Sequence, residues 1–431
     1  MNNSFGYRSL LFFSIPSILT SLTEVLASGI DTALVGHLST LALAALAVAS
    51  TVFNSFNWLF NFLINSSLEA VANYRGQSDE EKLTNQIRLS IILAIIVGII
   101  ATVMLLLGKK LWFSMAGARE SFMSELNSYY IIRASFQWLS IIFFTVLSLL
   151  RGLGLVQFSF YMILGSTLTN ALISYLLIYQ FGFGVEGAAI GTVASVFIYF
   201  TISILVLIRK QPRILQAPWK KLWGGELKRL GANSRDLFIR SLFLTASFFI
   251  STRVASQLGM HTLASHQVLL QAWLLCAYVV DGIAVSGTIL GAEKFGQNNI
   301  EQCRILSQKL LHMGGVIGLI FTLLYFFGEG QFILLFSKDD KIYQVVGQYW
   351  SLIVWSQILN AAAFVYDGLL FGFNRFSYLR KHMIYGVFFI FLPLASFSWI
   401  IGALGPLWWG MVLLNLYRAM TGFQEIKRLL S

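Results

Sequence analysis

The second half of the chain repeats the pattern of the first half at a constant offset. The stretch Leu149–Gly152 aligns with Leu369–Gly372, and Gly76–Gln77 aligns with Gly296–Gln297 at the same offset. Each half contains six long apolar segments, so the sequence is a tandem duplication of one six-segment unit. This duplication favours a fold with two lobes of similar architecture over any single, continuous core.

The apolar segments are long enough to cross a membrane as helices. Hydrophobic residues make up 57% of the chain and charged residues only 11%, whereas soluble domains carry about 25% charge. A helix needs about 20 apolar residues to cross a membrane, and the segments lack the two-residue alternation of a barrel strand. We therefore predict an all-α polytopic membrane protein with about twelve transmembrane helices in two six-helix lobes. The predicted spans are 9–35, 41–68, 86–107, 127–150, 158–180, 185–208, 234–258, 262–290, 306–327, 344–371, 380–402 and 405–424.

Six spans per half is an even number, so both halves enter the membrane from the same side. The halves are then parallel repeats, related by a pseudo-two-fold axis along the membrane normal. The predicted organisation is an N-terminal lobe (1–209), a cytoplasmic linker (210–233) and a C-terminal lobe (234–431). The linker is basic and carries tryptophans, which is typical of an amphipathic segment lying on the membrane surface. Its aromatic and proline residues include Pro218, Trp219 and Trp223.

Lysine and arginine residues concentrate on one side of the predicted bundle. If the N-terminus is cytoplasmic, 22 of them lie on the cytoplasmic side and 5 on the opposite side. By the positive-inside rule, both termini of a multi-pass protein of the inner (plasma) membrane then lie in the cytoplasm. The basic residues that give the net charge of +11 therefore orient the protein and contact membrane lipids. They do not indicate a nucleic-acid partner.

Two acidic residues lie within the first predicted span. An ionisable group at mid-depth in the membrane costs about 2.5–3.5 kcal/mol, so each requires an explanation. Glu24 and Asp31 are seven residues apart and therefore share one helix face. Because an apolar environment favours the protonated form of a carboxyl group, either residue could take up a proton. We favour this functional interpretation for Asp31, and a hydrogen bond in a packed core or a water-facing position for Glu24.

Four asparagines form a stripe along the second predicted span. Their spacings of three and four residues place them on one broad helix face. Amide side chains in membrane helices either bridge neighbouring helices or line a wet cavity. Bridging is the commoner case, but four amides are more than bridging needs, so we interpret the stripe as the lining of a substrate cavity. Its members are Asn54, Asn57, Asn61 and Asn65.

The C-terminal half has its own charged residues within predicted spans, Asp281, Asp367 and Arg240. We treat these as secondary candidates, and for the arginine a buried ion pair is the simpler interpretation. The five histidines do not cluster, and the two cysteines have no metal or disulfide spacing. No P-loop, HExxH or GxSxG motif occurs. We therefore expect no cofactor, no metal site and no enzymatic activity.

Several stretches resemble, in order along the chain, signatures of the MATE (multidrug and toxic compound extrusion) transporters, especially the DinF-like branch of the MOP flippase superfamily. The first is the IDTALVGHL stretch at Ile30–Leu38, and the tenth span carries YDGLLFG at Tyr366–Gly372. The others are Leu150–Gly152, Asp281–Ala284 followed by Gly291 and Gly296, and Gly405–Gly410. The chain is identified as a member of this family because the set covers nearly its whole length.

The resemblance implies a monomeric, cation-coupled antiporter that exports organic, often cationic and amphipathic, compounds by alternating access. It matches Asp31 with the first-helix acid that takes the coupling cation, H+ or Na+, and matches Asn170 and Thr192 with polar partners of that acid. The acid expected one turn after Asn170 is Ser174 here. Because Na+ needs several oxygen ligands with negative charge, this loss favours H+. Glu24 could replace the missing acid, which would reopen the Na+ alternative.

Two other functions remain open at this point. A flippase for lipid-linked precursors, from the same superfamily, would need a strongly cationic cavity. A membrane-embedded enzyme would need clustered histidine or acid ligands at one depth. The acids of the first span and the scattered histidines favour an antiporter over both. Glu69, at the end of the second span, also departs from the family pattern and leaves the substrate range open.

Overall fold

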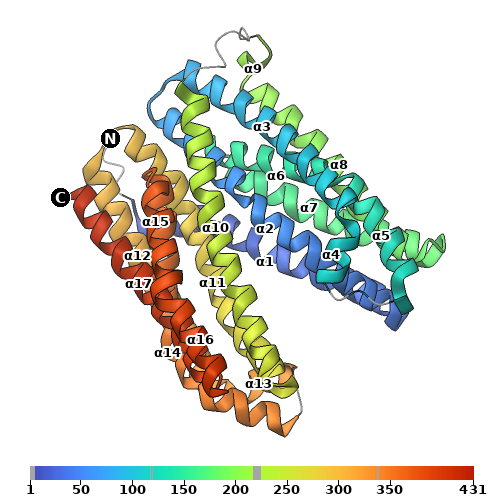
Figure 1. Ribbon diagram of the computed structural model, residues 1–431. Coiled ribbons are helices and arrows are strands. Elements are labelled where there is room, and N and C mark those ends of the chain that lie inside the picture. Colours follow the sequence, from blue (N-terminus) through green and yellow to red (C-terminus); the bar gives the residue numbers. More distant parts are fainter. Residues whose placement is uncertain (1–4, 117, 119, 217–224, 337–338) are drawn as a thin grey trace. The chain divides into compact units, whose positions relative to one another are not determined.

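The computed structural model describes residues 5–116, 118, 120–216, 225–336 and 339–431. Every regular element in this described part is helical, as predicted (Figure 1). The helices of the first half are α1 (Tyr7–Gly36), α2 (Thr40–Gly76), α3 (Glu80–Leu107), α4 (Lys109–Met115), η1 (Glu120–Phe122), α5 (Met123–Ser135), α6 (Gln137–Gly152), α7 (Val156–Tyr175), η2 (Leu176–Gln180), α8 (Gly184–Lys210) and α9 (Arg213–Gln216). Those of the second half are α10 (Gly225–Gln257), α11 (Met260–Gly296), α12 (Ile300–Phe327), α13 (Glu329–Phe336), α14 (Asp340–Gly372), α15 (Phe376–Gly386), η4 (Val387–Phe391), α16 (Leu392–Ile401) and α17 (Gly405–Leu430).

Each of the twelve predicted spans corresponds to one helix or to two or three consecutive helical segments. Within the described residues, ten helical segments are long and apolar enough to cross a membrane. The pair α5 and α6, bent by 48° at its junction, brings the number to eleven. The predicted span 405–424 is helical as α17, contains Arg418 and is not among these segments.

The chain divides into two compact units. The N-terminal unit contains residues 19–234, and the C-terminal unit contains Arg235–Ser431 together with the start of α1 up to Ile18. The predicted N-terminal lobe contains all of the first span, whereas in the structure the first turns of α1 pack with α11. At Gly282 on α11, a Cβ atom would lie only 2.5 Å from Cα of Ile18, so this close packing requires glycine.

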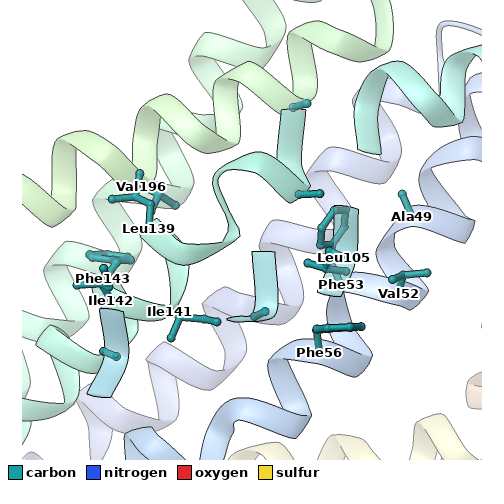
Figure 2. Packing of buried hydrophobic residues seen from close by; sticks show 14 of the residues in the cluster. Ala49, Val52, Phe53, Phe56, Leu105, Leu139, Ile141, Ile142, Phe143 and Val196 are labelled. Carbon is teal, nitrogen blue, oxygen red and sulfur yellow. The ribbon is translucent and has the colours of Figure 1, made fainter. Parts of the chain in front are cut away.

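The core of the N-terminal unit is a cluster of buried apolar side chains. Figure 2 shows part of it, including Phe53 and Phe56 of α2, Leu105 of α3, Phe143 of α6 and Val196 of α8. Lipid tails are as apolar as these side chains, so burial from water adds little to the association of the helices. Close packing and van der Waals contact therefore hold this cluster together.

The internal repeat reappears in the geometry of the turns. Ser78 and Asn298, which correspond to each other in the two repeats, both adopt left-handed backbone conformations, with φ of 56° and 54°. Gly154 and Asn374, at the same offset, also have positive φ values of 89° and 56°. L-residues other than Asn and Asp rarely adopt this conformation. The duplication that the sequence predicts is thus also seen in the backbone conformation of the turns that follow corresponding helices.

The predicted linker 210–233 is only partly described. It contains the short helix α9 and the first turns of α10, which begins at Gly225, before the predicted span start at 234. Pro218, Trp219 and Trp223, on which the prediction of a membrane-surface segment depended, lie outside the described residues.

Candidate functional site

Asp31, Asn170 and Ser174 form a chain of hydrogen bonds in the N-terminal unit. Asn170 on α7 donates from Nδ2 to Oδ1 of Asp31, on α1, at 3.0 Å. Ser174, one turn further along α7, donates from its hydroxyl to Oδ1 of Asn170, also at 3.0 Å. Asn170 and Ser174 are buried, and Asp31 is half-buried. Three residues that the family resemblance singled out are therefore in contact.

The close approach of α8 to α7 supports this chain. At Gly191 on α8, a Cβ atom would lie 2.2 Å from Oγ of Ser174 and 2.9 Å from its backbone nitrogen. Only glycine allows the two helices to come this close. Thr192, the next residue, donates its hydroxyl to the carbonyl of Ala188 at 3.0 Å within α8. Its hydroxyl hydrogen is thus directed into its own helix and not toward Asp31.

The π-helical turn η2, which continues α7, contacts the end of α1. The hydroxyl of Tyr179 donates to the carbonyl of Leu34 at 2.7 Å. This bond fixes the last turn of α1, just after Asp31, against the same helix that carries Asn170. Sequence reasoning did not select Tyr179, because nothing in its sequence neighbourhood distinguishes it from the many other aromatic residues.

Arg133 brings a positive charge to the same region. It lies on α5, and its charge acts on the carboxyl group of Asp31. The guanidinium also hydrogen-bonds to Tyr129, and its Cζ lies 5.2 Å from the ring centroid of Phe53. The sequence contained a signal for this residue, because an arginine within a predicted span is costly and usually functional. Arg133 was nevertheless not among the site residues predicted from the sequence.

Glu24 lies away from Asp31 on the same helix. It is exposed on α1, and seven residues of helix separate it from Asp31 by about 10 Å along the axis. Two carboxylates that share one cation lie within about 5 Å of each other, because each must approach the ion closely. The geometry therefore gives no support to Glu24 as the replacement for the acid missing at Ser174.

The asparagines of α2 do not behave as a uniform stripe. Asn57 accepts a hydrogen bond at its Oδ1 from Nε2 of Gln137, on α6, at 3.0 Å. Asn65 donates to the backbone carbonyl of Asn61 at 3.3 Å within α2. Asn54 is exposed. Thus Asn57 bridges two helices and Asn65 bonds within its own helix, so a role in lining a cavity stays a prediction for the group.

The secondary candidates of the C-terminal unit include a buried ion cluster. Asp367 on α14 accepts hydrogen bonds at Oδ2 from both Arg240 on α10 and Arg418 on α17. All three side chains are buried. Arg418 also donates to Asn415 at 2.6 Å, which extends the cluster along α17. A carboxylate held by two arginines is poorly suited to bind a further cation. Asp281 on α11 is exposed, and its charge also acts on Arg240.

No group of three or more His, Cys, Asp and Glu side chains is arranged to hold a metal ion, as far as the described residues extend. The two cysteines, Cys276 and Cys303, are buried free thiols.

A family model described as MatE matches residues 16–176 and, a second time, residues 237–397. The chain belongs to the MatE family. The two matches cover about three quarters of the chain, and each falls on one of the two repeats that the sequence predicts. The protein is therefore a multi-span membrane transporter and not an enzyme.

Individual relatives match almost the whole chain. Protein DETOXIFICATION 45, chloroplastic, from Arabidopsis thaliana is 25% identical over 97% of this chain and 78% of its own length. DNA damage-inducible protein F from Escherichia coli is 24% identical over 91% and 86%. The probable multidrug resistance protein NorM from Photorhabdus laumondii is 26% identical over 94% and 92%.

The fold is also similar to that of solved MATE structures. The bent form of the Vibrio cholerae MATE transporter VcmN superposes with a TM-score of 0.89 over 98% of this chain and 97% of that chain, at 15% sequence identity. At this level of identity the likeness concerns the fold alone.

Proposed function

We propose that the protein exports organic, often cationic and amphipathic, compounds across the inner membrane in exchange for H+. The observation that carries the choice of H+ is the orientation of Asn170. Its amide NH2 points to Asp31, and its carbonyl oxygen accepts the hydrogen bond of Ser174. Asn170 therefore presents its NH2 group, and not its carbonyl oxygen, to Asp31, and that oxygen already accepts one hydrogen bond.

This arrangement is better suited to a proton than to Na+. A hard cation such as Na+ needs several oxygen ligands, and carboxylates strengthen its site. Within the hydrogen-bonded group Asp31–Asn170–Ser174, Asp31 is the residue that contributes a carboxylate, and Ser174 occupies the position where a second acid is expected. Arg133 adds a positive charge nearby. A proton needs only one oxygen atom, so Asp31 by itself is sufficient to carry it.

Protonation of Asp31 changes its hydrogen bonds. The ionised carboxylate makes a charge-assisted bond with Asn170, and the protonated form loses that assistance. The bond between α1 and α7 weakens as a result, which gives the N-terminal unit two states of different geometry. In the proposed cycle, the substrate binds when Asp31 is ionised and leaves after Asp31 takes a proton from the outside. The name of the NorM relative, a probable multidrug resistance protein, supports organic compounds as substrates.

The test is dye efflux from proteoliposomes under imposed gradients. We expect a proton gradient to drive efflux of a lipophilic cationic dye by the wild type, and a Na+ gradient at constant pH to have no effect. Asp31→Asn should abolish proton-driven efflux, because the amide cannot take up a proton. Glu24→Gln is the matched control, since it neutralises an acid on the same helix, and it should retain efflux.

Efflux driven by the Na+ gradient would contradict the choice of H+, and retained proton-driven efflux in Asp31→Asn would refute the role of this residue. If neither gradient moves any dye, the flippase alternative becomes the better explanation, and lipid-linked substrates would be tested in the same vesicles.

A further inference from the structure

Arg133 is a cation inside a site that is proposed to bind cations. It lies in the last turn of α5, before the 48° bend between α5 and α6. Its Nε is buried and has no hydrogen-bond partner within the described structure. A buried guanidinium nitrogen without a partner is costly, and it is a free donor for a group that enters the site.

The guanidinium is held in place on two sides. Its Cζ lies 5.2 Å from the ring centroid of Phe53, and Phe53 packs in turn against Tyr130 at 5.3 Å between centroids. Tyr129, one turn earlier on α5, hydrogen-bonds to the same guanidinium. A planar guanidinium that is fixed in this way presents a fork of donors that matches the two oxygens of a carboxylate.

The charge of Arg133 also acts on Asp31, and both act on Tyr129. The side chain that hydrogen-bonds to Asp31 is the neutral amide of Asn170, which is bonded in turn to the neutral hydroxyl of Ser174. Among the described residues, the charges that act on this region when Asp31 is ionised are thus the negative charge of Asp31 and the positive charge of Arg133. A purely cationic compound at Asp31 would leave Arg133 without a counter-charge, and the repulsion between the two positive charges would weaken its binding.

We propose that Arg133 is the receptor for an anionic group of the substrate, so that this site selects zwitterionic amphiphiles. The positive group of such a compound lies at Asp31 and its carboxylate at Arg133. Protonation of Asp31 removes the partner of the positive group and thereby favours release. This inference rests on the proposed proton exchange and specifies its substrate class and a specificity-determining residue.

A matched pair of dyes tests this inference on the purified, full-length protein. Rhodamine 110 has a free carboxylate and is zwitterionic, and rhodamine 123 is its methyl ester and a simple cation. Binding is measured by fluorescence polarisation at a pH where Asp31 is ionised. We expect the wild type to bind the acid about tenfold more tightly than the ester, because the charge-assisted bond to Arg133 exists only for the acid.

Arg133→Gln should remove this preference. It should weaken the binding of the acid and leave the binding of the ester unchanged or make it tighter. Arg133→Lys should retain part of the preference, because it keeps the charge but loses the fork of donors. Arg253→Gln, which changes an exposed arginine of α10, is the control and should behave as wild type. The ratio of the two dyes within one variant does not depend on the fraction of folded protein.

Three outcomes would overturn the inference. They are equal binding of both dyes by the wild type, equal weakening of the binding of both dyes in Arg133→Gln, and no binding of either dye. Transport of the same dyes separates it from the proposed function. If the protein prefers the ester and exchanges it for protons, the proposed role of Arg133 as an anion receptor is refuted and the proposed antiport is supported. If the protein prefers the acid but a proton gradient moves neither dye, the proposed antiport is refuted and the proposed role of Arg133 is supported.

Discussion

Ser174 limits the number of oxygens that the site around Asp31 offers to a cation. It lies one turn after Asn170 on α7 and is fully buried. Its hydroxyl already donates to Asn170, so it contributes no negative charge. In the proposed mechanism, the choice between H+ and Na+ therefore depends on very few atoms, and a single substitution should be able to change it.

We predict that Ser174→Asp introduces Na+-driven transport. A second carboxylate one turn from Asn170 supplies the charge and oxygens that a Na+ site needs. The isosteric variant Ser174→Asn adds the same bulk without charge and should not respond to Na+, so it controls for crowding against Gly191. The measurement is dye efflux under a Na+ gradient at constant pH. A folded Ser174→Asp protein that still exchanges only protons would contradict the idea that the missing carboxylate at position 174 prevents Na+ coupling.

At the scale of single elements, the first turns of α10 are attached to α2 within the N-terminal unit. Arg229 on α10 forms an ion pair with Glu69 on α2 at 2.7 Å, and the hydroxyls of Ser66 and Ser234 lie 3.1 Å apart. The side chain of Glu69 is 0% exposed, whereas that of Arg229 is 24% exposed. This contact explains the unusual acid at the end of the second span, and it depends on a helix start that the sequence did not predict.

We predict an asymmetric double-mutant cycle for this pair. Arg229→Gln leaves a carboxylate buried without a counter-charge and should destabilise the protein by about 3 kcal/mol. Glu69→Gln should cost less, because Arg229 can direct its guanidinium to water. The double variant should be more stable than Arg229→Gln alone. Thermal unfolding in detergent measures all four proteins, and equal losses for the two single variants would contradict a buried carboxylate at Glu69.

The caps of α3 and α12 offer a comparison between the two repeats. Asp79 accepts a hydrogen bond from the backbone N–H of Lys82 at 3.0 Å, and Asn299, its counterpart in the second repeat, accepts one from Gln302 at 3.0 Å. Hydrogen bonds from Lys82 lower the pKa of Asp79 below its ordinary value. A lowered folded-state pKa gives a contribution that is present above the unfolded pKa and is lost as the pH falls through the folded value.

We therefore predict that acidification loosens the start of α3 and not that of α12. Below about pH 4, protonation of Asp79 weakens its cap, whereas the amide of Asn299 does not titrate. Hydrogen exchange, corrected for the intrinsic effect of pH, should show a loss of protection in the first turn of α3 alone. Equal losses in both turns would mean that the charge of Asp79 contributes nothing to the cap.

At the scale of the whole molecule, the sequence predicted much of the fold because its signals are strong and local. Apolar runs predict helices, and the internal repeat predicts two halves of similar architecture. Asp31 was selected as an ionisable residue within a predicted span, and Asn170 was found through family resemblance. Arg133 and Tyr179 were not, since their positions near α1 depend on how α5 and η2 pack. The division of α1 between two units was missed for the same reason, because an apolar pattern does not specify a neighbour.

The two repeats also differ in what their acids can do. Asp31 in the N-terminal unit is half-buried and bonded to a neutral amide, whereas Asp367 in the C-terminal unit is buried between Arg240 and Arg418. We expect a carboxylate that compensates two buried guanidinium groups to be important for stability, because its loss leaves both charges without a counter-ion. The duplication thus leaves the proposed proton-binding role to one lobe and a structural role to the other.

We predict that Asp367→Asn and Asp31→Asn have opposite consequences. Asp367→Asn should lower the free energy of unfolding by about 3–5 kcal/mol, and adding Arg418→Gln should recover part of this loss. Asp31→Asn should leave unfolding nearly unchanged and remove proton-driven efflux. Thermal unfolding and efflux are measured on the same preparations, with efflux normalised to folded protein. If Asp367→Asn is as stable as wild type and loses proton coupling, the C-terminal unit has a coupling acid as well, and the functional asymmetry between the lobes is refuted.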